Sequence, residues 1–129
     1  MTAEVNNYVR YQFNGFGMGL ERTEVELPTP TGTEVLVRVN FCGVCHSDVH
    51  IYEGYYGLGQ GKKLSLEDRG IKLPVTLGHE IVGTIESVGE QANDIKMGQQ
   101  VLVYPWIGCG ECSVCQRGEE NICTKPAAL

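Results

Sequence analysis

Four cysteines in the last quarter of the chain have the spacing of a metal-binding site. Cys109, Cys112, Cys115 and Cys123 form a C-x2-C-x2-C-x7-C pattern. Four thiolates this close in sequence can surround one Zn2+ ion tetrahedrally, which leaves no coordination position for water or a substrate. The pattern therefore predicts a structural zinc site, in a lobe of about residues 105–126, and it places any reaction elsewhere in the chain.

Two other states of these cysteines remain open from the sequence. The same thiolates could hold an iron–sulfur cluster. They could also form two disulfides, which would require an oxidising compartment. The first residues, Met-Thr-Ala-Glu-Val, show no basic start followed by an apolar run, so we expect no export signal and a cytoplasmic location, which favours metal over disulfides.

Two shorter stretches contain all three histidines and compete for the reactive site. Residues 42–50 read Cys-Gly-Val-Cys-His-Ser-Asp-Val-His, and residues 74–80 read Pro-Val-Thr-Leu-Gly-His-Glu. A catalytic zinc has fewer than four permanent protein ligands and one open position. Cys45 and His79 are suitable donors, and Glu80 adds a carboxylate next to one of them. An isolated cysteine is more often a small buried apolar residue, and we expect this of Cys42.

Length and composition are those of one ordinary domain. The chain has 129 residues, of which 42% are hydrophobic, and a formal net charge of −6. We expect such a chain to bury about two-thirds of its unfolded surface. The acidic balance argues against nucleic acid as a partner. No apolar run approaches the roughly 18 residues of a membrane span, so we expect no membrane partner.

Most of the elements that would position these residues are predicted to be strands. Runs rich in β-branched residues are separated by glycine and proline, which favours a mainly β fold closed or partly closed into a barrel. The expected strands are residues 8–13, 34–39, 80–88 and 100–104.

Helical signals are short. Ser47 is expected to cap a turn through residues 48–53, and Ser65 could start another at residues 65–68. Residues 57–72, with glycines at one end and mixed charges at the other, are expected to form an exposed loop.

Three motifs in order resemble the zinc-dependent medium-chain alcohol dehydrogenases. These are Gly-Val-Cys-His-Ser-Asp at residues 43–48, Gly-His-Glu at residues 78–80, and the four-cysteine run. The resemblance covers about residues 34–125. It implies that residues 1–129 are the GroES-like catalytic domain, a twisted antiparallel β-barrel, of such an enzyme.

The resemblance implies a catalytic zinc site around one cysteine and one histidine. Cys45 and His79 match zinc ligands, and Glu80 matches a neighbouring carboxylate that can lie close to the metal. Asp48 matches the carboxylate that orients the ligand histidine. The family also uses a further thiolate as a ligand, and this chain offers none at a matching position.

The resemblance also implies roles in proton transfer and in binding the other reactants. Ser47 matches the hydroxyl that takes the proton of the alcohol, and His50 the residue that passes it to solvent. His46 lies where the family has a basic residue near the cofactor pyrophosphate. Trp106 matches an aromatic residue of the substrate pocket, although packing at a barrel end explains it nearly as well.

The implied reaction is oxidation of an alcohol to an aldehyde or ketone by hydride transfer to NAD or NADP, with zinc as the Lewis acid. A Rossmann domain is absent from these 129 residues, so we expect an N-terminal fragment, inactive by itself, of a homodimer or tetramer. A polyol dehydrogenase of the same superfamily is the alternative enzyme. The alternative that is not an enzyme is a zinc-binding module that contacts partner proteins.

Overall fold

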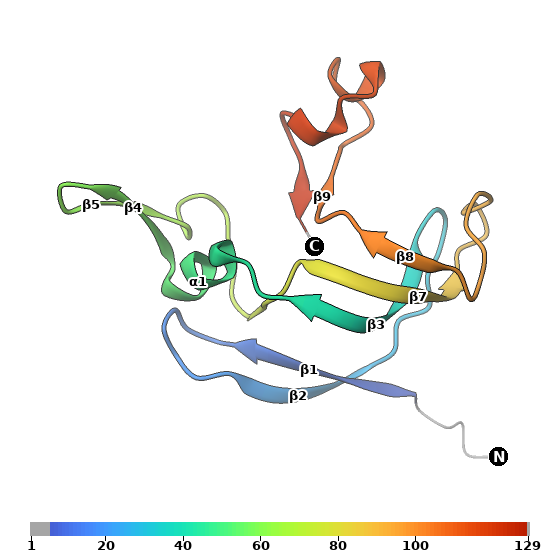
Figure 1. The fold of residues 1–129 in the computed structure, drawn as a ribbon, viewed down its shortest axis with the longest axis horizontal. Helices are drawn as coiled ribbons and strands as arrows, with labels where there is room; N and C mark the ends of the chain where they lie inside the picture. The colour runs from blue at the N-terminus through green and yellow to red at the C-terminus, as the bar shows by residue number, and fades with distance from the viewer. Residues whose placement is uncertain (1–5, 129) are drawn as a thin grey trace.

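The computed structural model describes residues 6–128, and these are mainly β, as predicted (Figure 1). The one α-helix among them, α1, is His46–Glu53, and two 3-10 helices are η1 (Cys115–Arg117) and η2 (Glu120–Ile122). The strands are β1 (Asn7–Phe13), β2 (Glu21–Glu26), β3 (Val35–Gly43), β4 (Tyr55–Gly59), β5 (Lys62–Ser65), β6 (Val75–Thr76), β7 (Glu80–Val88), β8 (Gln100–Val103), β9 (Trp106–Ile107) and β10 (Ala127–Ala128).

The first sheet has the antiparallel strand order β2-β1-β6. The last two residues of β1, Gln12 and Phe13, are both buried, and Phe13 is fully so. The expected strand at residues 8–13 is confirmed. The β2 strand was missed because its sequence, Glu-Arg-Thr-Glu-Val-Glu, is mostly charged and only Thr23 and Val25 are half-buried.

The second sheet has the antiparallel order β3-β7-β8 and contains the other three predicted strands. The β7 strand begins and ends as expected, and its Ile85 is only 2% exposed. Gly83 lies where β7 passes close to β3, because a Cβ there would come within 2.6 Å of the Arg38 carbonyl oxygen. This close pairing places Gly43, at the end of β3, opposite Glu80, at the start of β7.

The N-cap of α1 lies two residues earlier in the chain than predicted. The N-cap residue is Cys45, not Ser47, and the Asp48 carboxylate accepts a hydrogen bond from the Cys45 backbone N–H. This arrangement is a capping box in which an aspartate closes the first turn. Gly54 ends the helix in the left-handed conformation.

The prediction of an exposed loop at residues 57–72 was wrong in its first half. The β4 and β5 strands form an antiparallel hairpin there, and the Lys63 ammonium lies 3.6 Å from the centre of the Tyr55 ring. Gln60 and Gly61 at its tip both have positive φ, as a tight hairpin turn requires. Ser65 begins a turn, not a helix, by accepting a hydrogen bond from the Asp68 N–H.

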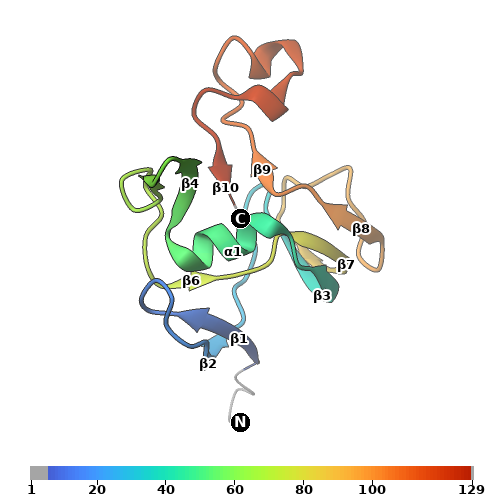
Figure 2. The ribbon, with the colours of Figure 1, turned by 60° about the vertical axis from the view of Figure 1, so that its left-hand side comes forward.

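The zinc lobe predicted for residues 105–126 projects from the two sheets on a narrow stalk (Figure 2). The stalk is the antiparallel pair β9 and β10, in which Ile107 is opposite Ala127. The two 3-10 helices lie in the lobe between these strands. The two ends of the lobe are therefore adjacent, and both connect to the rest of the protein through this strand pair.

Less of the chain is buried than its length predicts. Its accessible surface is 9627 Å2, whereas a compact protein of 14.2 kDa would expose about 6,800 Å2 and its unfolded chain about 20,600 Å2. The chain thus buries about half of its surface, not two-thirds. Phe41 and Leu102, on the second sheet, are 76% and 77% exposed. Among residues 6–128 no helix has the length and apolar character to cross a membrane.

Candidate functional site

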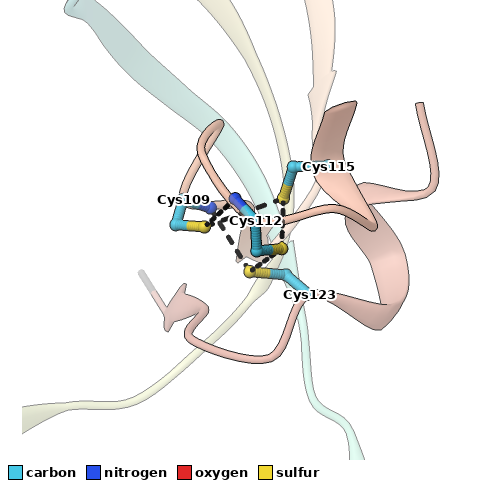
Figure 3. A group of neighbouring side chains, drawn as sticks. All are labelled: Cys109, Cys112, Cys115 and Cys123. Atoms are coloured by element: carbon cyan, nitrogen blue, oxygen red, sulfur yellow. Dashed lines mark hydrogen bonds between the residues drawn. The ribbon is translucent and has the colours of Figure 1, made fainter. Parts of the chain in front are cut away.

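The four cysteines of the lobe converge on one point (Figure 3). Their sulfur atoms all lie within 4.8 Å of one another. Recorded Sγ–Sγ distances are 3.5 Å for Cys112 to Cys115 and 3.9 Å for Cys112 to Cys123. Tetrahedral Zn–S bonds of about 2.3 Å place two sulfurs about 3.8 Å apart. The geometry therefore fits one zinc ion, and all four cysteines are free thiols, so the disulfide alternative is not supported.

Backbone groups of the lobe are arranged to stabilise negative sulfur. Cys112 N–H points to the Cys109 sulfur at 3.4 Å, and Lys125 N–H points to the Cys123 sulfur at 3.3 Å. Hydrogen bonding from the Cys115 backbone lowers the pKa of the Cys112 thiol to about 5, whereas burial raises the pKa of the Cys115 thiol to about 12. A buried thiol of this kind ionises when a cation is its neighbour, as metal ligation requires.

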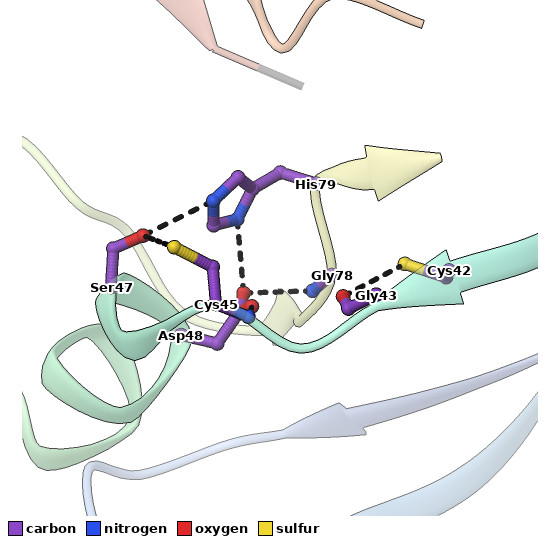
Figure 4. A network of polar contacts seen from close by, with 7 residues as sticks. All are labelled: Cys42, Gly43, Cys45, Ser47, Asp48, Gly78 and His79. Atoms are coloured by element: carbon purple, nitrogen blue, oxygen red, sulfur yellow. Dashed lines mark hydrogen bonds and ion pairs between the residues drawn. The ribbon is translucent and has the colours of Figure 1, made fainter. Parts of the chain in front are cut away.

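Asp48 joins the two stretches that the sequence singled out (Figure 4). This carboxylate is only 5% exposed. It accepts hydrogen bonds from Cys45 N–H at 2.9 Å, from Gly78 N–H at 3.0 Å and from His79 Nδ1 at 3.1 Å. One buried anion therefore fixes the start of α1, the loop before β7 and the orientation of the histidine ring.

Ser47 lies between the two expected zinc ligands. Its hydroxyl oxygen is 3.2 Å from the Cys45 sulfur and 3.1 Å from His79 Nε2. When Nδ1–H donates to Asp48, a neutral His79 presents an Nε2 lone pair. The single hydroxyl hydrogen of Ser47 then faces two electron-pair donors. A cation that accepts electron pairs from both the sulfur and Nε2 would satisfy this donor set, so the residues fit a catalytic zinc.

The protonation behaviour of both ligands reflects their contact with each other and with Ser47. Hydrogen bonds from the Ser47 hydroxyl and backbone lower the pKa of the Cys45 thiol, and the charge of Glu80 opposes this. Burial works against a charged His79, but hydrogen bonding to Cys45 and the charge of Asp48 outweigh it and raise the pKa of the imidazole. The lowered pKa of Cys45 favours its thiolate, the raised pKa of His79 favours its protonated form, and both residues lie beside the buried Asp48 carboxylate.

Glu80 and Cys42 lie beside this cluster but form no recorded hydrogen bond to either ligand. The Glu80 side chain lies over Gly43, so its contact with a metal stays a prediction. The expectation that Cys42 is buried was wrong, because its side chain is exposed. Its thiol points to the Gly43 carbonyl oxygen at 3.6 Å and lies against Gly78. Cys42 lies near the end of β3, where it is opposite Ile81 of β7.

His46 and His50 lie one turn apart on α1, and their ring centroids are 4.6 Å apart. His50 also packs against the Tyr56 ring at 4.7 Å. Tyr56 was not singled out from the sequence, because only the tertiary fold brings β4 back to the helix. Trp106 is 42% exposed on β9, and its role in a substrate pocket stays a prediction.

Two cavities among the described residues lie away from this cluster. Cavities of about 520 and 390 Å3 run between the two sheets and share Leu27, Pro28, Leu36 and Glu86 as lining residues. No predicted site residue lines either one. These two cavities are therefore separate from the cluster of metal donors.

Comparison with known proteins gives the same assignment as the motifs. The family profile described as "Alcohol dehydrogenase GroES-like domain" matches residues 31–129. An NAD-dependent alcohol dehydrogenase of Sulfurisphaera tokodaii is 44% identical over 113 residues, which are 88% of this chain and 31% of that protein. A D-arabinose 1-dehydrogenase (NADP(+)) of Saccharolobus solfataricus is 38% identical over 108 residues, or 84% of this chain and 28% of that protein.

A solved structure agrees with these sequence matches. The crystal structure of a short chain alcohol dehydrogenase, rspB, of Escherichia coli CFT073 complexed with NADH superposes with a TM-score of 0.75 at 34% identity, over 95% of this chain and 32% of that chain. The predicted GroES-like fold is confirmed. The chain spans less than a third of the length of the curated relatives it matches.

Proposed function

The chain belongs to the alcohol dehydrogenase GroES-like domain family, and we propose that it is the metal-binding catalytic part of a zinc-dependent alcohol dehydrogenase. The observation that carries the proposal is the cluster in which Asp48, Ser47 and the Cys45–His79 pair are joined by hydrogen bonds. A cysteine and a histidine with a hydroxyl between them could bind a metal and a substrate hydroxyl at one point.

Each residue of the cluster has a distinct proposed role. Cys45 and His79 would hold the zinc, which supplies the Lewis acidity that makes a hydroxyl easier to deprotonate. Ser47 would accept the proton of the substrate hydroxyl, because its oxygen lies between both ligand atoms. His50, four residues further along α1, would pass this proton to solvent. Asp48 would keep the His79 ring in the orientation that leaves Nε2 free.

The remaining predicted residues would act at the edges of the reaction. His46 is exposed at the start of α1 and would contact the phosphates of NAD or NADP, which accept the hydride. Glu80 is close enough for its charge to act on Cys45 and could approach the metal. Trp106 would line the substrate pocket. The lobe with its four cysteines would hold a structural zinc.

The substrate would be a small alcohol, oxidised to an aldehyde or ketone. A polyol or sugar is the second candidate, because one relative is a D-arabinose dehydrogenase. The relatives include an NAD-dependent and an NADP-dependent dehydrogenase, so either nucleotide is a candidate cofactor. We propose a cytoplasmic enzyme that assembles as a homodimer or tetramer.

A chimeric enzyme tests the proposal. We would join this chain to the remaining two-thirds of the Sulfurisphaera tokodaii relative and follow NAD(P)H formation with a panel of primary, secondary and polyhydric alcohols. We expect turnover that is lost on Cys45→Ser and on His79→Gln. Cys42→Ser is the matched control, since this exposed thiol has no proposed role, and it should retain activity.

The failure of this experiment would be informative if the metals are measured as well. A chimera that binds zinc and NAD(P) but oxidises none of the alcohols would overturn the enzyme assignment. The non-enzymatic zinc-binding module would then be the better interpretation, and the exposed apolar residues of the second sheet would be its candidate contact surface.

A further inference from the structure

The two histidines of α1 form a cluster that the proposed reaction uses only as separate residues. His46 and His50 are four positions apart, so their side chains project from the same face of the helix. Their ring centroids are 4.6 Å apart and the rings are tilted by 38°. His46 is exposed and His50 is half-buried, so the pair opens to solvent on one side.

One nitrogen of this pair lacks a partner. His50 Nδ1 is buried and has no hydrogen bond with any described residue. The rings recorded against His50 are those of His46 and Tyr56. Neither ring stacking nor a phenol face supplies the partner that an imidazole nitrogen needs. A cation coordinated by this nitrogen would be such a partner.

We propose that His46 and His50 together form a second transition-metal site, a two-imidazole chelate for a divalent cation such as Ni2+, Cu2+ or excess Zn2+. Two histidines four residues apart on one helix face are a spacing that binds zinc in other helices. Imidazole is a donor that suits all three of these ions. The chain also carries a net charge of −6, which attracts cations to its surface.

This site is distinct from the two expected zinc sites. It uses neither the lobe cysteines nor the Cys45–His79 pair, and two protein donors leave positions open for water. The affinities should follow the order Cu2+ above Ni2+, with Zn2+ below Cu2+. If the proposed function is correct, an ion held here would also withdraw His50 from proton transfer and His46 from the cofactor, so excess metal would inhibit the enzyme. The site itself does not depend on that function.

Nickel binding to the zinc-loaded chain tests the proposal. The protein would be saturated with zinc, freed of excess metal, and titrated with Ni2+ by calorimetry. We expect one Ni2+ per chain, and we expect His46→Gln or His50→Gln to weaken its binding roughly a hundredfold, because a chelate becomes a single donor. Since the chain has three histidines, His79→Gln is the matched control and should leave this Ni2+ in place.

Each outcome supports or overturns the site. Wild-type protein that binds no Ni2+ would overturn it, as would equal binding by the wild type and His50→Gln. Loss of the Ni2+ in His79→Gln would place the ion at the Cys45–His79 pair instead. Circular dichroism of every variant would show that the fold is retained. Alcohol oxidation is not measured, so failure here leaves the proposed function untouched, and failure of the chimera leaves this site untouched.

Discussion

At the scale of single residues, Asp48 connects the most parts of the candidate site. Its buried carboxylate accepts three hydrogen bonds, from the start of α1, from the loop before β7 and from the His79 ring. Hydrogen bonds to a buried charged group contribute more to stability than neutral ones. An uncharged replacement should therefore disturb both the fold and the metal donors.

Asp48→Asn should lower the free energy of unfolding by about 2–4 kcal/mol, because the amide presents one acceptor oxygen where the carboxylate presents two. Urea denaturation checks this value. The same variant should bind metal more weakly at the Cys45–His79 pair, since His79 loses its orienting anion. Asp94→Asn is the control: Asp94 is exposed, and its replacement should change stability by less than about 0.5 kcal/mol. Equal stabilities of the two variants would contradict the role of Asp48.

Glu34 provides a pH-dependent prediction away from the metal donors. Hydrogen bonds from the Thr31 backbone N–H, at 2.9 Å, and from its hydroxyl lower the pKa of the Glu34 carboxyl. A carboxyl with a lowered folded pKa stabilises the protein above its unfolded pKa and loses this contribution as the pH falls through the folded value. Glu34→Gln should therefore be less stable than wild type at neutral pH, with a difference that shrinks in acid.

The measurement is the urea midpoint of both proteins over a pH series from neutral to strongly acidic. Glu111→Gln is the control, because Glu111 is exposed and forms no recorded hydrogen bond. The role of Glu34 would be refuted by a gap between wild type and Glu34→Gln that stays constant at every pH.

Residue types and spacing were enough to single out several side chains that the fold brings together, whereas their roles stay predictions. The four cysteines are local in sequence, and Cys45, Asp48 and His79 were named before their contacts were known. The double contact of Ser47 with Cys45 and His79 was beyond the sequence, because it depends on how α1 packs against a loop thirty residues away. The exposure of Cys42 was also missed, since a strand-like neighbour does not show whether anything covers the strand end.

At the scale of elements, α1 is held at its far end by the connection between β1 and β2. The Phe16 ring packs against Gly54, the helix cap, and the Gly17 N–H donates to the Tyr52 carbonyl at 2.8 Å. Phe13 joins this cluster with its ring centroid 5.6 Å from that of Tyr52. The helix that carries the candidate residues is thus anchored by Asp48 at one end and by aromatic rings at the other.

Gly54→Ala should destabilise the protein through two effects. Gly54 has φ of +83°, which costs an L-residue about 1–2 kcal/mol, and a Cβ there would come within 2.6 Å of the Phe16 ring. Gly59→Ala is a matched control, because Gly59 has φ of +78° and nothing within 4 Å of such a Cβ. Thermal unfolding should show the larger loss for Gly54→Ala. Equal losses would mean that Phe16 moves aside without cost.

Strands with alternating apolar residues could be predicted from the sequence, and strands without this pattern could not. The β7 strand has apolar residues at the right period and was located correctly, whereas the charged β2 strand and the glycine-rich β4–β5 hairpin were not. In β2 the pairing with β1 determines the strand, and in the hairpin the turn at Gln60 and Gly61 does. Both depend on partners or backbone angles that a hydrophobic pattern does not encode.

At the scale of the whole molecule, the protein consists of an open body and a lobe built around four cysteines. The body leaves large apolar side chains such as Phe41 and Leu102 exposed, and contiguous apolar exposure is typical of contact surfaces. The sequence could not predict this openness, because hydrophobic content shows what could be buried and not what the available chain covers. The lobe, by contrast, has little apolar core and relies on its thiolates.

Removal of the lobe zinc should therefore loosen the lobe selectively. After chelation, or in Cys112→Ser, we expect amide hydrogen exchange in residues 109–123 to rise at least about tenfold, while β3 and β7 keep their protection. Mass spectrometry of peptides from both regions would measure this. Loss of protection in β7 to the same extent would show that the metal holds the whole fold together.

The stalk of β9 and β10 has a consequence for how the protein is made. Every donor of the cysteine cage lies on one short run of chain, and none comes from an earlier segment. During translation the complete set of thiols becomes accessible as soon as Cys123 leaves the ribosome. The four cysteines can then bind zinc before another surface covers the exposed apolar residues of the second sheet. Limited zinc in the growth medium should consequently reduce the yield of this polypeptide at the stage of synthesis, before any assembly.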